Sequence, residues 1–99
     1  MSFKQLDPLL HSQLRLAIMS LLIGVEKAGF QFLLEETEST KGNLSVQLKK
    51  LKEAGYIEIH KSFKGSYPHT EASVTQQGRK AFEKYVNTIS EYLDVEKND

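Results

Sequence analysis

The amino-acid sequence predicts a mainly helical α+β fold, in the order helix, short extended stretch, helix, helix, strand, strand, helix. Leucines recur at helical spacing in the first half of the chain, residues 56–74 are rich in strand and turn signals, and a long amphipathic stretch follows residue 75. At 99 residues, the chain is expected to be a single domain over 1–99, with residues 95–99 frayed.

The first helix is predicted to begin at Asp7-Pro8, because Asp caps helix N-termini and Pro fits the first helical position. Leu16 and Met19 lie off its buried stripe and predict a second apolar surface, one that faces another subunit. The stripe itself has i, i+3, i+4 spacing and consists of Leu14, Ala17, Ile18, Leu21 and Leu22.

Two further helices are predicted in the middle of the chain. Phe30 ends a brief extended run, and residues 31–37 form a short helix. Hydroxyl side chains at 39–40 cap a third helix over about 41–54, which Gly55 ends. The inner stripe of the third helix is Leu44, Leu48 and Leu51.

A hairpin and a last helix complete the prediction. Residues 56–63 alternate as a half-buried strand does, 64–69 are turn-rich, and 70–74 form the returning strand. Thr75 caps the last helix. Its apolar stripe is Phe82, Tyr85, Val86, Ile89, Tyr92 and Leu93.

Two short helices across a tight turn, followed directly by a hairpin, are the layout of a winged helix-turn-helix. Several motifs match this layout in order and spacing: Leu6-Asp7-Pro8-Leu9-Leu10-His11-Ser12, Arg15-Leu16, Gly42-Asn43-Leu44-Ser45, Leu48-Lys49-Lys50-Leu51, Glu53-Ala54-Gly55-Tyr56-Ile57, Pro68-His69-Thr70 and Val74-Thr75-Gln76-Gln77-Gly78-Arg79. Together they resemble the small winged-helix transcriptional regulators related to the MarR and ArsR groups. Val74 and Gln76-Gln77 depart from the usual last motif, which has Leu and acidic residues there.

The resemblance implies sequence-specific binding of duplex DNA by a homodimer. In such a regulator, helix 41–54 lies in the major groove and hairpin 57–74 is the wing on the backbone or the minor groove. The first and last helices would form the dimer interface, so that two half-sites of a near-palindromic operator are read.

The third helix itself has suitable chemistry for reading bases. With its leucines inward, Asn43 and Gln47 carry amides that can pair with adenine. Lys50 can donate to guanine and Val46 can contact a thymine methyl. The alternative is an ordinary solvated helix face. Expected phosphate contacts are Ser39, Thr40, Lys41, Ser45 and Lys49.

The hairpin and the apolar faces supply the remaining site predictions. Wing contacts to DNA are expected from Lys61, Lys64, Ser66, Tyr67 and His69, although a plain hairpin tip is the alternative. The last helix is long for so small a domain, and this favours a two-fold interface. The expected interface residues are Leu9, Leu16, Met19, Tyr85, Ile89 and Tyr92.

Composition excludes several other classes. A formal net charge of zero argues mildly against nucleic acid, but the lysines concentrate between residues 40 and 69. No cysteine, no phosphate-cradling loop and three scattered histidines predict a non-enzyme without metal or cofactor. The apolar stretch 14–25 is too short and interrupted for a membrane span, and the N-terminus lacks a signal-peptide pattern, so a cytoplasmic protein is expected.

These observations favour a homodimeric repressor that binds duplex DNA. The rival interpretation is a winged-helix module for protein–protein contact without a DNA role. A small-molecule effector bound in the dimer groove is left open, and no residue identifies one.

Overall fold

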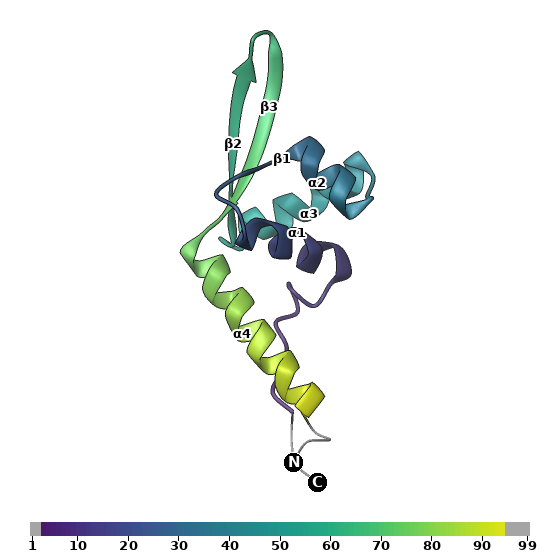
Figure 1. Ribbon diagram of the computed structural model, residues 1–99, viewed down its shortest axis with the longest axis vertical. Helices are drawn as coiled ribbons and strands as arrows, with labels where there is room; N and C mark the ends of the chain where they lie inside the picture. The colour runs from purple at the N-terminus through teal and green to yellow at the C-terminus, as the bar shows by residue number, and fades with distance from the viewer. Residues whose placement is uncertain (1–2, 95–99) are drawn as a thin grey trace.

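The computed structural model describes residues 3–94 and confirms the α+β winged-helix fold. An elongated molecule results, in which the hairpin projects at one end and the last helix at the other (Figure 1). The expected fraying of residues 95–99 lies outside the described residues. The elements are α1 (Gln13–Ile23), β1 (Ala28–Gly29), α2 (Phe30–Thr37), α3 (Lys41–Glu53), β2 (Ile57–Lys64), β3 (Tyr67–Val74) and α4 (Gln76–Leu93).

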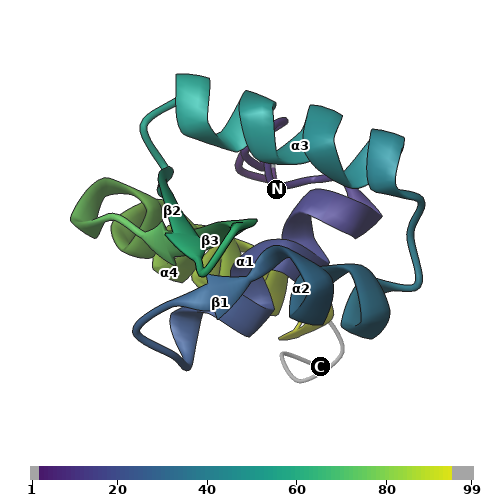
Figure 2. The same cartoon turned by 90° about the horizontal axis from the view of Figure 1, so that it is seen from above.

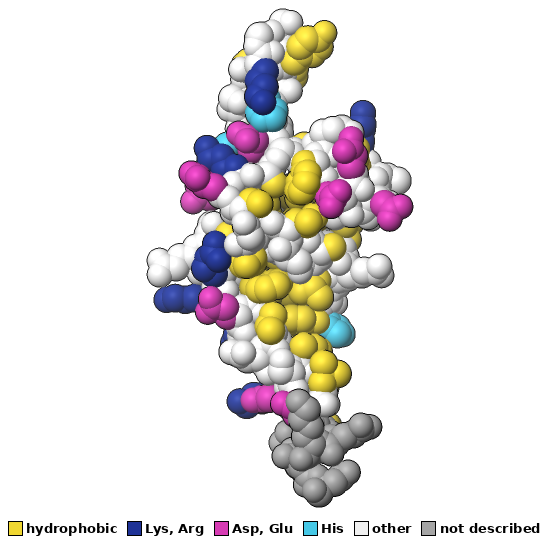
Figure 3. Space-filling view, in the orientation of Figure 1, with side chains coloured by type: hydrophobic (Ala, Val, Ile, Leu, Met, Phe, Trp, Pro, Cys, Tyr) yellow, Lys and Arg dark blue, Asp and Glu magenta, His cyan; other side chains and the backbone are white. Residues whose placement is uncertain are grey.

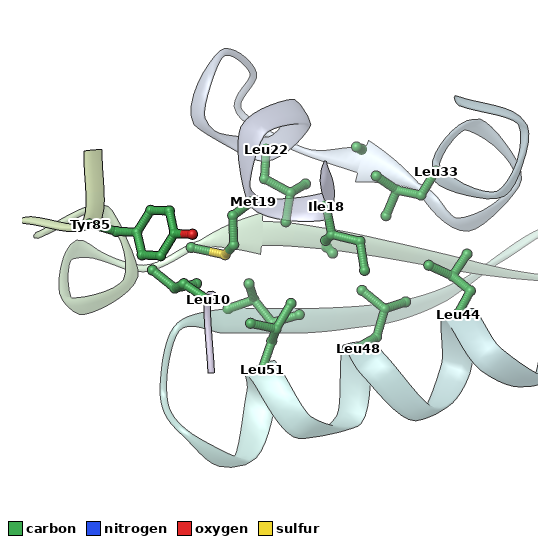
Figure 4. Close-up of a cluster of buried hydrophobic side chains, with 12 residues drawn as sticks. Leu10, Ile18, Met19, Leu22, Leu33, Leu44, Leu48, Leu51 and Tyr85 are labelled. Carbon is green, nitrogen blue, oxygen red and sulfur yellow. The ribbon is translucent and has the colours of Figure 1, made fainter. Parts of the chain in front are cut away.

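The core is a leucine-rich layer between the three N-terminal helices and the base of the hairpin. Side chains of α1, among them Ile18 and Leu22, face the inner stripe of α3, and Leu33 closes one end (Figure 4). Met19 is fully buried in this same core, so the prediction that it faces another subunit is wrong. Its side chain packs near Leu10 and Tyr85 at the end of the core nearest α4 (Figure 4).

The first helix starts later than predicted. Asp7 does not cap α1; its Oδ1 accepts from the Leu9 amide at 2.8 Å, and its carbonyl accepts from the His11 amide at 2.9 Å. These bonds close a separate turn, which carries Leu10 into the core. Ser12 is the residue before α1, with an extended backbone.

The hairpin spans 57–74 as predicted, but its paired strands are longer because its turn is tighter. Gly65 has a φ of +64° and opens a two-residue turn, so pairing continues out to Lys64 and Tyr67. The segment predicted as a turn over 64–69 is therefore mostly strand. The short β1 pairs with β3 only at Ala28–Gly29, near the base. Beyond it the hairpin has two strands alone, an edge position that tolerates Pro68.

The hairpin base and the start of α4 share one tight joint. The Thr75 hydroxyl donates to the Gly55 carbonyl at 2.6 Å and accepts from the Gly78 amide at 3.0 Å, which confirms Thr75 as the cap of α4. The Thr75 amide donates to the Tyr56 carbonyl at 3.0 Å. A Cβ at Gly78 would lie 2.1 Å from that carbonyl oxygen, so only glycine fits there.

We expect Gly78→Ala to lower the free energy of unfolding by about 2 kcal/mol or more, because the added methyl group overlaps backbone rather than a movable side chain. Urea denaturation measures the loss. Gly42→Ala is the matched control: nothing lies within 4 Å of its added Cβ, and α3 should gain up to about 1 kcal/mol. Equal stabilities for the two variants would contradict this account of the joint.

Candidate nucleic-acid interface

Helix α3 lies on the outside of the molecule, along one side of the other elements (Figure 2). Leu44, Leu48 and Leu51 hold its inner face in the core, and nothing in the described chain covers the opposite face. Its first turn is fixed by Thr40, whose hydroxyl accepts from the Asn43 amide at 3.1 Å. The helix is therefore anchored on one side and free to meet a partner on the other.

Most of the predicted base-reading and phosphate-contacting side chains of α3 and of the turn before it lie on the exposed surface. Val46 is 49% exposed, although its side chain is apolar. Asn43 and Lys50 are also exposed, together with Lys41, Ser45 and Lys49. Ser39 differs, because it is half-buried and its hydroxyl lies 2.8 Å from that of Thr37.

Gln47 is not the free amide that the sequence suggested. It is half-buried, and both ends of its side chain are bonded within the protein. Its Oε1 accepts from Nη1 of Arg15 on α1, and its Nε2 donates to Asn43 Oδ1 at 3.0 Å. Arg15 also donates to the Leu9 carbonyl at 2.6 Å. Gln47 thus links α1 to the exposed Asn43 amide.

A groove of about 400 Å³ runs between α3 and the hairpin. Lys49 and Lys52 border it from α3, and Lys61 borders it from β2. Apolar side chains of α3 and β2, Leu48 and Ile59, also line it. Lys52 was not among the DNA contacts predicted from the sequence, although its i+3 spacing from Lys49 places the two lysines on one side of a helix. The groove joins cations from the two elements predicted to hold DNA.

The distal half of the hairpin is exposed on both faces. Lys61, Lys64, Ser66 and Tyr67 are all exposed, and Tyr67 reaches 76%. His69 lies further back, half-buried, with its Nε2 3.6 Å from Glu71 Oε2. Phe63 is in phase with Ile57 and Ile59 in the alternation that predicts a half-buried strand over 56–63, but it is 73% exposed, because the hairpin extends past the layer that covers its base. Its place two residues before Gly65 was the available signal.

A second exposed surface is apolar and involves α1 and α4. Hydrophobic side chains gather over these helices on the face seen in Figure 3. Of the predicted interface residues, Leu9, Leu16, Ile89 and Tyr92 keep part of their surface exposed. Tyr85 is buried, with its hydroxyl 2.9 Å from His11 Nδ1, so its predicted interface role is not supported. The exposed apolar side chains nearby are Phe3, Val86 and Leu93.

The N-terminal segment runs beside the second half of α4 (Figure 1). Phe3 stacks on Tyr92 with ring centroids 4.6 Å apart, and the Tyr92 hydroxyl donates to the Lys4 carbonyl at 2.7 Å. Further along, Tyr56 donates to Asp7 Oδ2 at 2.6 Å. Burial, this hydrogen bond and the Asp7 charge together raise the pKa of Tyr56 from 10.0 to about 12.

Across residues 3–94, no helix is both long and apolar enough to cross a membrane. The same residues hold no group of three or more His, Asp and Glu side chains that could bind a metal ion.

Comparison with known proteins agrees with this geometry. The model of the winged helix DNA-binding domain family matches residues 14–93, so the chain belongs to that family. The resemblance to winged-helix regulators predicted from the sequence is thereby confirmed.

Three relatives and neighbours illustrate the similarity. The chain is 40% identical, over 88 residues, to an uncharacterized protein of Methanocaldococcus jannaschii, covering 89% of this chain and 92% of that protein. A transcriptional regulator homologue from Pyrococcus horikoshii OT3 shares the fold at a TM-score of 0.81 and 24% identity, over 87% of this chain and 85% of that one. Bacillus subtilis PadR, solved in complex with operator DNA, has a TM-score of 0.68 and 17% identity, over 76% of this chain and 48% of its own.

We expect one tyrosine to ionise near pH 12 in a spectrophotometric titration, and Tyr56→Phe to abolish that step, because the pKa of Tyr56 is raised to about 12. A raised pKa favours the folded state while the phenol is neutral. This contribution is fully present below pH 10, the ordinary tyrosine value, and is lost as the pH rises through 12. Asp7→Asn should lower the high pKa only in part, since burial remains. A Tyr56→Phe titration identical to that of the native chain would contradict the assignment.

Proposed function

We propose that this protein is a sequence-specific regulator of transcription that binds duplex DNA as a homodimer and represses by occupying a promoter. Helix α3 (41–53) would lie in the major groove, and the hairpin over 57–74 would be the wing. The observation that carries the proposal is the uncovered face of α3, bordered by a lysine-bearing hairpin that projects from the body.

The chemistry of α3 supports direct reading of bases. The major groove of B-DNA, about 12 Å wide, admits an α-helix. Val46 offers an exposed apolar contact for a thymine methyl, and the Lys50 ammonium is a donor for guanine O6 and N7. Asn43, in the first turn, is placed where recognition helices meet base edges.

Phosphate binding would use cations on both sides of the groove between α3 and the hairpin. Lys49, Lys52 and Lys61 border this groove, and Lys64 extends the cationic surface to the hairpin tip. A net charge of zero does not oppose this, because three exposed carboxylates, Glu35, Glu36 and Glu38, belong to α2 and its end. An uneven charge distribution orients the protein toward DNA even without net charge.

The apolar face over α1 and α4 supports the homodimer. Phe3, Val86 and Leu93 expose large side chains there, and Leu9, Leu16, Ile89 and Tyr92 add partly exposed surface. A self-complementary patch gives a two-fold dimer. Two copies of α3 would then read a near-palindromic operator.

We expect Lys50→Glu to lower specific affinity at least about tenfold, since a good base contact contributes about 1–3 kcal/mol. The native chain first selects a binding sequence from random duplexes at physiological salt, and a fluorescence-anisotropy titration then measures each variant on it. Lys27→Glu is the control of equal charge change, because the loop between α1 and β1 lies on the opposite side from α3 (Figure 2).

Equal affinity of the two lysine variants for the selected duplex would contradict the assignment of α3 as the reading helix. A native chain that selects no motif, and whose weak binding disappears with modest added salt, would contradict sequence-specific binding altogether. That second outcome favours the rival function, a winged-helix module for protein contacts.

We expect Leu93→Lys to weaken self-association at least about tenfold, because burying one leucine contributes about 1.5–3 kcal/mol and each dimer has two copies. Leu93 is 74% exposed in the single chain, so the change should leave unfolding of the monomer nearly unaltered. Analytical ultracentrifugation measures the equilibrium. Val25→Lys, on an exposed residue between α1 and β1, is the control. If both changes weaken self-association equally, or if neither weakens it, the interface is contradicted.

A further inference from the structure

Three side chains form a hydrogen-bonded chain from the core side of α1 to the outside of α3. Arg15 is held at its Nε by the Leu9 carbonyl, and its Nη1 donates to Gln47 Oε1. The Nε2 of Gln47 then donates to Asn43 Oδ1 at 3.0 Å. Arg15 and Gln47 are half-buried, whereas Asn43 is exposed. The last member of the chain is therefore the one that can meet DNA.

Arginine fixes the direction of these bonds. A guanidinium has five N–H donors and no acceptor, so Gln47 must turn its oxygen toward Arg15. The NH2 group of Gln47 then faces Asn43, and the Asn43 side chain can accept this hydrogen bond only through its oxygen. Asn43 consequently turns its oxygen toward Gln47, while its NH2 group makes no hydrogen bond within residues 3–94. The donors are left for a ligand, and the amide orientation follows from bonding chemistry rather than from a choice between equivalent ends.

We propose that Arg15 is a specificity-determining positioning residue: through Gln47 it presents Asn43 to DNA as a hydrogen-bond donor. This inference rests on the proposed function. Asparagine reads adenine when its oxygen and its NH2 group both face the base. With the oxygen turned toward Gln47, Asn43 instead favours a base edge that presents acceptors without an amino donor, guanine O6 and N7 or thymine O4, over adenine, whose N7 acceptor lies beside the N6 donor.

The surrounding structure holds Asn43 in this state. Its backbone amide is bound by the Thr40 hydroxyl at 3.1 Å, which fixes the first turn of α3. Turning the Asn43 amide over would place its NH2 group against that of Gln47 and lose the bond between them. Turning Gln47 as well would place a donor against Arg15, which can accept nothing. Reversal at Asn43 therefore breaks either its bond with Gln47 or the bond between Gln47 and Arg15.

A single substitution should reverse the direction of the chain. Glutamate at position 47 accepts from Arg15 as glutamine does, but it has no donor for Asn43. Asn43 must then donate its NH2 group to the carboxylate and turn its oxygen outward. An outward oxygen accepts from adenine N6 or cytosine N4. Gln47→Glu is thus expected to change which base is preferred, and not merely how tightly DNA is bound.

The test is selection from random duplexes with the full chain, for the native protein and two variants. Native protein should prefer guanine or thymine at one position of each half-site, and Gln47→Glu should prefer adenine or cytosine there, each by about tenfold. Gln13→Glu is the matched control, an exposed glutamine that lines the same shallow groove as Asn43. It adds the same charge without joining the chain, so its selected bases should equal those of the native protein.

The outcomes separate this inference from the proposed function. If selection with the native protein yields no motif, the proposed function is overturned, and the inference with it. A native motif that Gln47→Glu leaves unchanged at every position, or that Gln13→Glu changes in the same way, overturns the inference alone.

Two additional measurements keep the test decisive if Gln47→Glu does not fold. Gln47→Met leaves the Arg15–Leu9 bond in place and removes the link, so the preference at that one position should fall severalfold while the others persist. Without DNA, amide NMR should show the Gln47 side-chain NH2 signals shifting in Arg15→Met. Unchanged signals in that variant, or an unaltered base preference in Gln47→Met, would also overturn the inference.

Discussion

The packing of three leucines of α3 against α1 is the contact on which the other features depend. Leu44, Leu48 and Leu51 are the side of α3 that belongs to the core, and their burial determines which side remains outside. This orientation of α3 about its own axis determines that its lysines and Val46 are exposed and that Asn43 lies on the outer side. A helix turned by one residue, about 100°, would bury charge and expose leucine.

Periodicity was sufficient to predict the elements, because each helix and strand has one face that must be buried. Asp7 shows where such reasoning ends: an Asp-Pro pair suits a helix start, but the chain needed a separate turn to carry Leu10 into the core. Phe63 shows a second limit. Alternation continues along a strand even where no layer lies beneath it, so a pattern of burial can extend beyond the body that causes it.

The candidate interface was predictable in outline and less so in chemistry. Residue type and angular position around the helix were enough to predict that Val46 and Lys50 are exposed, because these two properties depend on the sequence of α3 alone. The state of Gln47 depends on Arg15, which lies 32 residues earlier and on another helix. Only the tertiary structure brings those two side chains together, and no spacing rule within α3 could have revealed the contact.

The joint at the base of the hairpin has a consequence for the operator of the proposed dimer. Hydrogen bonds among residues 55–56 and 75–78 join the base of the wing directly to the start of α4, so the direction of the wing is coupled to that of the proposed dimer helix. The angle of that joint would set the separation of two wings in a dimer, and hence the number of base pairs between half-sites. Relatives could then change operator spacing by altering a few residues far from any base, while their preferred half-site stays the same.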